Sequence, residues 1–259
     1  MNKMKLIITS LFLLVGLQTF SQVSGGQIRR KTNTAKVNRQ TPRKQFAPNE
    51  VVDVENGKIM NFETTQTVDL GLPSRTMWAG WNIGANSPKE EGEYYAWGET
   101  EPKSEYDWNN YFDIEQITPT IEFKKYHVNG ILSIVRTERD IALKKWGKPW
   151  KMPTKDQLEE LINYSSMHRV KFPNESKMYI LITGPNGKSI LFPLAGEKYK
   201  GETRTTFGEL CWSGELRPYY SASPQNSQFA FCLEANYPAG LRLSVGFRLY
   251  GMNVRAVTQ

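Results

Sequence analysis

Seven tryptophans, many of them close to glycine or proline, constrain the fold of this chain more than any other feature. They recur in AGW, WGE, WGKPW and CWSG. A tryptophan ring buries a large apolar area, and its indole N–H needs a hydrogen-bond acceptor. A neighbouring glycine lets the backbone approach such a ring closely. We therefore expect a loop-rich domain that packs around aromatic side chains, with most tryptophans in its core.

Two short helices are predicted in the middle of the chain. Thr137, with Asp140 three positions later, resembles a capping box before IALKKW, a helical segment that stops at Gly147. Thr154 and Gln157 repeat this arrangement before LEELINY. The apolar residues of LEELINY recur at helical spacing, so that one face of this helix should pack on the core.

From residue 178 onward the patterns are those of strands. MYILIT and SILFPLAG flank the turn sequence GPNG and predict a β-hairpin. FAFCLEA, GLRLSVGFRLY and MNVRAVTQ follow as further strands, separated by Gly, Pro and Asn. The order of elements predicts one α+β domain over residues 51–259. Its two helices precede a twisted antiparallel sheet, and residues 86–130 form a long irregular region.

Residues 1–21 have the organisation of a secretory signal peptide. MNKMK is charged, LIITSLFLLVGL is apolar, and QTFSQ permits cleavage after Ser21. The apolar run is shorter than the roughly 20 residues of a transmembrane helix. An uncleaved membrane anchor is the alternative. We expect an exported protein with no membrane span after cleavage, located in the periplasm, at the outer-membrane surface or outside the cell.

The formal net charge of +7 is concentrated in residues 22–50. The basic side chains of this segment are Arg29, Arg30, Lys31, Lys36, Arg39, Arg43 and Lys44. The segment has few apolar residues and is predicted to be a disordered basic linker. The remainder of the mature chain is close to neutral, so the charge does not indicate a nucleic-acid partner. The linker serves as a solvated tether or, alternatively, rests on an acidic surface or polysaccharide.

The two cysteines, Cys211 and Cys232, lie in separate strand-like runs. In an exported chain oxidation is the default, and a bridge closing this loop would stabilise the fold by about 3 kcal/mol in the chain-entropy model. Two free buried thiols are the equal alternative. The candidate disulfide joins Cys211 and Cys232.

The sequence contains no recognisable metal, cofactor or catalytic motif. His127 and His168 stand alone, without ligands at metal-binding spacing, and are expected to face solvent. No Gly-x-Ser-x-Gly elbow is present, and GPNGK is a hairpin turn rather than a phosphate loop. Paired carboxylates for glycoside hydrolysis have no specific pattern here. We expect a protein that is not an enzyme and has no cofactor, with a hydrolase as a minor alternative.

A series of separated motifs spans about residues 66–258. The motifs are VDLGLPSRTMWAGWNIGA, EEGEYYAWGETEPKSEYDWNNY, WGKPWKMPTKDQLEELI, GPNGKSILFPLAG, WSG and YGMNVRAV. The ordered series resembles the Fibrobacter succinogenes major paralogous domain family, found in exported proteins of Bacteroidota. The WSG motif departs from this pattern, since WSS is commoner in the family.

The resemblance implies a C-type lectin-like fold, related to the formylglycine-generating (sulfatase-modifying factor) superfamily. It does not imply that superfamily's enzyme activity, because those enzymes use two cysteines close together, whereas Cys211 and Cys232 are well separated. The Glu-Pro-Asn or Gln-Pro-Asp and Trp-Asn-Asp patterns of calcium-dependent lectins are also missing from the sequence. Within the family motif YYAWGETEP, we expect Tyr94, Tyr95 and Trp97 to be core residues that preserve loop architecture.

Aromatic and amide side chains beyond this motif are candidates for an exposed binding surface. The segment GELRPYYSASPQN is rich in Tyr, Ser, Asn and Pro, which make adaptable binding loops, although an ordinary exposed loop is equally consistent with it. The candidate ligand-binding residues are Trp108, Asn109, Asn110, Tyr111, Tyr219, Tyr220 and Asn226.

Together these observations favour an exported, non-enzymatic binding module that presents a loop surface to a glycan or to an envelope or host protein. The alternatives are a structural or assembly protein of the cell envelope and a hypervariable display protein of lectin-like fold. The ligand and the oligomeric state are not written in the sequence.

Overall fold

The computed structural model describes one compact unit that starts at Gln45, slightly before the predicted domain boundary. The signal peptide and most of the basic linker lie outside the described residues. None of the helices in the described ranges is long and apolar enough to cross a membrane. The described residues are 45–112, 127–128, 131–205, 208–217, 228–236 and 238–259.

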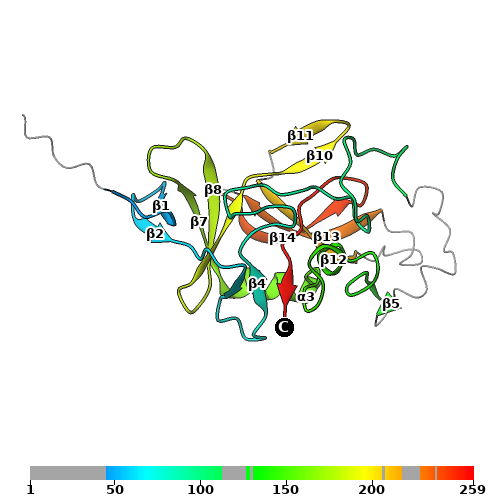
Figure 1. The fold of residues 1–259 in the computed structure, drawn as a ribbon, viewed down its shortest axis with the longest axis horizontal. Coiled ribbons are helices and arrows are strands. Elements are labelled where there is room, and N and C mark those ends of the chain that lie inside the picture. The colour runs from blue at the N-terminus through cyan, green and yellow to red at the C-terminus, as the bar shows by residue number, and fades with distance from the viewer. Residues whose placement is uncertain (1–44, 113–126, 129–130, 206–207, 218–227, 237) are drawn as a thin grey trace, which may run out of the picture. The chain divides into compact units, whose positions relative to one another are not determined.

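The largest sheet is antiparallel and has five strands in the order β2-β1-β7-β8-β9 (Figure 1). Its strands are β1 (Glu50–Asp53), β2 (Ile59–Asn61), β7 (Ser166–Lys171), β8 (Met178–Thr183) and β9 (Ser189–Pro193). The β8–β9 hairpin is the one predicted around GPNG, with Thr183 opposite Ser189. Apolar residues cover both faces of β8, because Ile180 and Ile182 pack in one core cluster while Leu181 packs in another.

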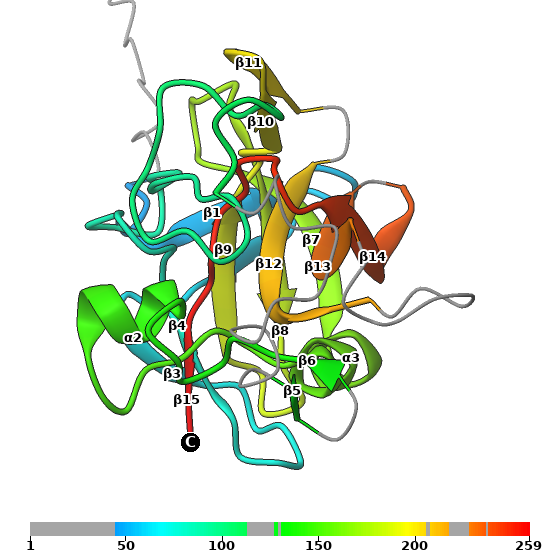
Figure 2. The same cartoon turned by 90° about the vertical axis from the view of Figure 1, so that its right-hand side faces the viewer.

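A second antiparallel sheet has the order β12-β13-β14. Its strands are β12 (Glu209–Leu216), β13 (Phe229–Asn236) and β14 (Gly240–Phe247). The short hairpin of β10 (Glu197–Tyr199) and β11 (Glu202–Arg204) stands beyond one end of this sheet (Figure 2). This arrangement brings one face of the β13–β14 pair close to the hairpin.

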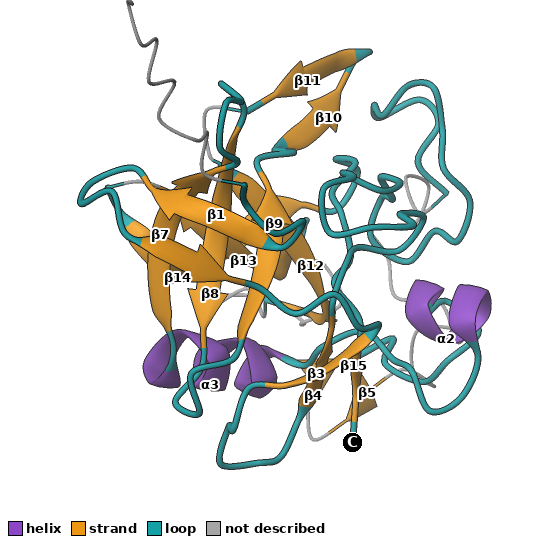
Figure 3. Cartoon of the chain, turned by 60° about the vertical axis from the view of Figure 1, so that its left-hand side comes forward, coloured by secondary structure: helices purple, strands orange, loops and turns teal. Residues whose placement is uncertain are grey.

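A third sheet pairs the last strand of the chain with a strand from the first part of the described unit. Its order is β15-β4-β3, with β3 (Thr67–Asp69), β4 (Met77–Ala79) and β15 (Val257–Thr258) (Figure 3). Two further strands, β5 (His127–Val128) and β6 (Ile131–Leu132), pair with each other. The final residues of the chain are therefore part of the core and not a tail.

The described residues contain two helices, α2 (Ile141–Trp146) and α3 (Lys155–Tyr164). The capping box of α3 is confirmed, since Thr154 and Gln157 each bond the other's backbone N–H. The predicted cap of α2 was wrong, because its N-cap is Asp140 and not Thr137. The buried Asp140 carboxylate accepts the N–H groups of Ala142 and Leu143 as well as that of Met152, beyond the helix. A hydroxyl could not accept so many donors.

The α+β class is confirmed, but the prediction of a single late sheet was wrong. The strands are short and divide into several small antiparallel sheets, with strands both before and after the helices. Glycines with positive φ interrupt the chain at many connections; at Gly196 an added Cβ would lie 2.0 Å from the Arg204 carbonyl oxygen. Gly196 therefore lets the chain come close to the end of β11 just before β10 begins.

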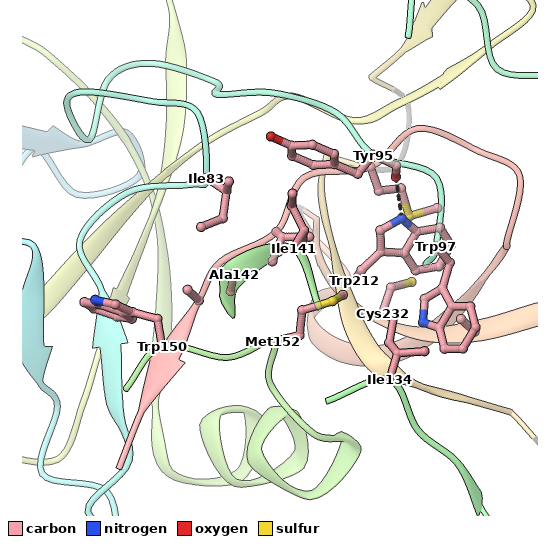
Figure 4. Close-up of a cluster of buried hydrophobic side chains, with 14 of the residues drawn as sticks. Ile83, Tyr95, Trp97, Ile134, Ile141, Ala142, Trp150, Met152, Trp212 and Cys232 are labelled. Carbon is pink, nitrogen blue, oxygen red and sulfur yellow. Dashed lines mark hydrogen bonds between the residues drawn. The ribbon is translucent and has the colours of Figure 1, made fainter. Parts of the chain in front are cut away.

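The irregular segment after β4, over residues 80–112, packs around the tryptophans. Tyr95 and Trp97 are buried, as predicted, and lie against Trp212 (Figure 4). The Trp97 indole N–H donates to the Ser213 carbonyl oxygen at 3.0 Å, and that of Trp212 to the Tyr95 carbonyl oxygen at 2.8 Å. The loop and strand β12 therefore fix each other through indole–backbone hydrogen bonds.

A fully buried arginine lies at the junction of the sheets. The Arg255 guanidinium donates to Asn82 Oδ1 at 2.8 Å, to the Leu191 carbonyl oxygen at 3.0 Å and to a third carbonyl. Asn82 Nδ2 donates in turn to Glu209 Oε1 at 3.1 Å, and Glu209 Oε2 accepts the Ala195 N–H at 2.8 Å. We call these three side chains, Arg255, Asn82 and Glu209, the buried network.

Replacing Arg255 with leucine should destabilise the fold by about 3–5 kcal/mol, because it leaves the buried Glu209 carboxyl group without its cation and several acceptors without donors. Urea denaturation followed by tryptophan fluorescence measures this loss. The control is Lys89→Met, which removes an exposed ion pair with Glu175 and should cost no more than about 1 kcal/mol. Equal losses in the two variants would contradict a structural role for the network.

The buried network should also make stability depend on pH. Burial raises the pKa of Glu209 from 4.5 to about 7, although the Ala195 N–H and Arg255 oppose the shift. Between these pH values the folded state keeps a proton that the unfolded state has lost. The free energy of unfolding should therefore fall as pH rises from about 4.5 to about 7, and this contribution should be level above that range.

Glu209→Gln should flatten this slope, because the amide does not titrate. Denaturation at several pH values checks the effect, with the exposed Glu202→Gln as a control that keeps the wild-type slope. A wild-type slope in Glu209→Gln would show that other groups carry the pH dependence.

Candidate functional site

A pocket of about 350 Å³ opens between the β10–β11 hairpin and the β13–β14 pair. Polar side chains from both hairpins and aromatic rings line it. We call it the aromatic pocket; the residues that define it are Glu197, Arg204, Phe229, Glu234, Arg242, Ser244, Phe247 and Tyr250. Its size is at the lower end of the range for small-molecule sites.

A continuous row of rings forms one side of the aromatic pocket. Phe247 is at its centre, with its ring centroid 4.5 Å from that of Phe229 and 5.3 Å from that of Tyr250. Tyr250 continues the row to Tyr199, at 4.9 Å, and the Trp108 ring meets Phe247 edge-on at 6.3 Å. The row thus runs from an exposed tryptophan in the irregular loop into the pocket.

Two carboxylates in the aromatic pocket each have an arginine partner. Glu234 and Arg242 face each other across β13 and β14 and form an ion pair. Arg204 lies 3.6 Å from Glu197 across the β10–β11 hairpin and also stacks over the Tyr199 ring. Burial raises the pKa of Glu197, and the positive charge of Arg204 partly offsets this. The pocket therefore offers hydrogen-bond donors and acceptors with little net charge.

Trp108 is the one predicted surface residue that the structure places next to this pocket, where its ring contacts Phe247 of the lining. Its side chain is 41% exposed, as expected for a binding residue. Asn109 and Asn110 are also exposed, but they serve their own loop: the Asn109 N–H donates to Asp107 at 2.8 Å and Asn110 Nδ2 to the Glu105 carbonyl oxygen at 2.9 Å. These two amides shape the turn that presents Trp108.

The prediction that Tyr111 is exposed was wrong. Tyr111 is buried, and its hydroxyl donates to the Trp97 carbonyl oxygen at 2.9 Å and accepts from Arg248 Nε at 3.1 Å. Burial raises the pKa of this phenol. The reason is that the loop folds back after Trp108, so that the next aromatic ring enters the loop's own core beside Tyr94 and Tyr106.

The other candidate residues, Tyr219, Tyr220 and Asn226, lie outside the described residues. Sequence reasoning missed the charged pairs of the aromatic pocket. The Glu234–Arg242 pair could have been found from the sequence. Each of these residues interrupts an apolar strand, and a hairpin between the two strands places them opposite each other. Glu197 and Arg204 face each other across a separate hairpin that the sequence patterns did not reveal.

The structure does not contain the expected disulfide between Cys211 and Cys232. Cys211 pairs with Leu233 and Cys232 with Trp212 across β12 and β13. Because successive side chains of a strand point to opposite faces, the two thiols lie on different sides of the sheet. Each belongs to a different core cluster.

Within the described ranges, no group of three or more His, Cys, Asp or Glu side chains could hold a metal ion. The chain was compared with protein-family models, with curated proteins and with solved structures, and none of them matches it.

Both cysteines should be inert in the folded protein. Burial raises the pKa of each thiol, and the neighbouring carboxylates Glu209 and Glu234 raise it further. A thiol-specific disulfide reagent should therefore react with neither cysteine in buffer and with both in denaturant. The intact mass of non-reduced protein should show two thiols. An intact mass lower by two hydrogens, together with no reaction of the reagent in denaturant, would show a disulfide and contradict the free-thiol geometry.

Proposed function

We propose that this protein is an exported binding module whose aromatic pocket holds a sugar unit of a glycan without converting it. The observation that carries the proposal is the combination of a row of aromatic rings with two ion-paired carboxylates in one pocket. Rings offer apolar faces to the C–H side of a sugar, and the charged pairs offer acceptors and donors to its hydroxyls.

The charge balance of the pocket favours a neutral ligand. Each carboxylate already has a cationic partner, so an anionic or cationic ligand gains no net attraction. The charged pairs also hold the pocket in one geometry before binding, because their side chains come from paired strands. A preformed pocket avoids the entropy cost of ordering its side chains upon binding.

We also propose a C-type lectin-like fold of the Fibrobacter succinogenes major paralogous domain family. The support is that motif residues far apart in the sequence meet in the core. Asn82 of WNIGA bonds Arg255 of NVRAV, and Trp97 of YYAWGE bonds the backbone of Ser213 in WSG. Two helices, small antiparallel sheets and a long irregular region are also consistent with this fold. Export to the periplasm, the outer-membrane surface or the medium follows from the proposed signal peptide.

One observation favours a protein ligand as the second candidate. Trp108 and Phe112, from the same loop, are 41% and 39% exposed. Exposed large apolar side chains in a soluble domain often mark a contact with another protein. In this case an envelope or host protein would bind over the loop, and the domain would have a role in assembly at the cell envelope.

A glycan-array screen of residues 22–259, with and without calcium, tests the proposal. Trp108→Ala and Tyr250→Ala should each weaken binding about tenfold or more, because each removes a ring from the aromatic row, and a factor of ten corresponds to about 1.4 kcal/mol. The matched control is Tyr164→Ala on α3, which removes an exposed ring outside the pocket and should leave binding unchanged.

Three outcomes separate the candidates. Selective binding lost in the two pocket variants supports a glycan site. Selective binding that both variants retain would place the ligand elsewhere and overturn the pocket. If the folded protein binds no glycan on the array, the glycan proposal is overturned and the protein ligand remains. A pull-down experiment with the Trp108→Ala variant as control would then test for a protein ligand.

A further inference from the structure

A serine, a histidine and an aspartate form a hydrogen-bonded chain on the five-stranded sheet, on strands that do not line the aromatic pocket. Ser166 Oγ lies 3.3 Å from His168 Nε2, and His168 Nδ1 lies 3.0 Å from Asp53 Oδ2. The aspartate contacts one ring nitrogen and the serine the other. This is the order of contacts by which a nucleophilic serine is activated.

The pairing of two strands produces this arrangement. Ser166 and His168 are two positions apart on β7, so both side chains lie on the same face. Asp53 lies opposite Val170 on the neighbouring strand β1, which makes it the diagonal neighbour of His168. Ser166 is also the first residue of β7, immediately after the C-cap of α3. Its hydroxyl is therefore held at an exposed end of the strand.

Asp53 is well suited to orient the imidazole. The residue is 3% exposed, and its carboxylate accepts the Glu55 N–H at 2.9 Å and the Asn56 side-chain amide at 3.2 Å. Burial raises the pKa of Asp53, but the Glu55 N–H and His168 outweigh burial and leave the pKa lowered. An ionised Asp53 accepts the Nδ1 proton, which leaves Nε2 of His168 free to accept the proton of the Ser166 hydroxyl.

A second pocket, also of about 350 Å³, adjoins this chain of residues. Asp53 and His168 line it, and so do Ser165 and Met167, the sequence neighbours of Ser166. Ile162, Leu241 and Pro238 add apolar walls, which suit a short acyl group. Ser166 itself is not among the residues that line the pocket, but its hydrogen-bond partner His168 is, so the cavity lies next to the imidazole that would activate the serine.

We propose that Ser166, His168 and Asp53 form a catalytic site for the hydrolysis of small acyl esters. Ser166 Oγ attacks the ester carbonyl while its proton passes to His168 Nε2; the C–O bond to the alcohol then breaks, and the alcohol leaves with that proton. Water repeats the sequence on the acyl-serine, releasing the carboxylic acid and restoring Ser166. His168 acts as base and then acid, and Asp53 is a positioning residue.

This activity goes beyond the proposed binding function and does not depend on it, because the two pockets share no residue. In the sequence, His168 is a lone histidine that is expected to face solvent. Its hydrogen-bond partner, Asp53, is distant in the sequence and comes close to His168 only because β1 pairs with β7.

A fluorophosphonate probe tests the nucleophile directly in the protein of residues 22–259. Attack by Ser166 forms a P–O bond and releases fluoride, and peptide mass spectrometry locates the modified residue. Ser166→Ala should abolish labelling. The matched control is Ser176→Ala, which removes an exposed hydroxyl in the connection between β7 and β8, outside the pocket, and should keep labelling.

Hydrolysis of p-nitrophenyl acetate provides the second readout. His168→Gln should lower the rate about 100-fold or more, as expected for loss of a general base, while thermal unfolding shows that the variant is folded. Absence of labelling in the folded wild-type protein would overturn the proposal. Equal labelling or equal hydrolysis in wild type, Ser166→Ala and His168→Gln would do the same.

Discussion

The rest of the structure depends on the hydrogen bonds of one buried guanidinium. Arg255 is fully buried, and its Cζ lies 3.8 Å from the Phe192 ring centroid. Its hydrogen bonds join the C-terminal segment to β9, to the end of β4 and to Asn82 in the loop after β4. Asn82 extends the connection to Glu209 at the start of β12. Buried charged groups contribute little to the net free energy of folding. Any alternative packing that leaves them buried without hydrogen-bond or charge partners is strongly unfavourable, however. The network therefore specifies how the small sheets meet.

The irregular region gains its order from the same segments. Asn253 Nδ2 donates to the carbonyl oxygens of Glu91 and Glu93, and Tyr95 forms a β-bridge with Met252. Gly246 lets the Trp212 ring approach β14, since an added Cβ would lie 2.8 Å from that ring. The loop is thus a packed core of its own, and Trp108 is presented to solvent from a rigid base.

The two proposed sites illustrate different uses of strand pairing. In the aromatic pocket, direct cross-strand neighbours such as Glu234 and Arg242 neutralise each other and shape a binding surface. On the five-stranded sheet, a diagonal neighbour orients His168 toward Ser166 and leaves a hydroxyl at the open end of the strand. The first arrangement favours binding because its charges are balanced. The second favours chemistry because its proton acceptor is aligned with a nucleophile.

Local sequence patterns are enough to predict the capping box at Thr154, the GPNG hairpin, the α+β class and the burial of Tyr95 and Trp97. These follow from short-range spacing and from the cost of exposing large rings. Three features follow from the packing of the chain instead: Tyr111 turns inward, Cys211 and Cys232 face opposite sides of a sheet, and Asp53 contacts His168. These three features depend on strand register and on contacts between segments that are distant in the sequence. Local patterns do not encode such contacts, because they form only when the whole domain packs.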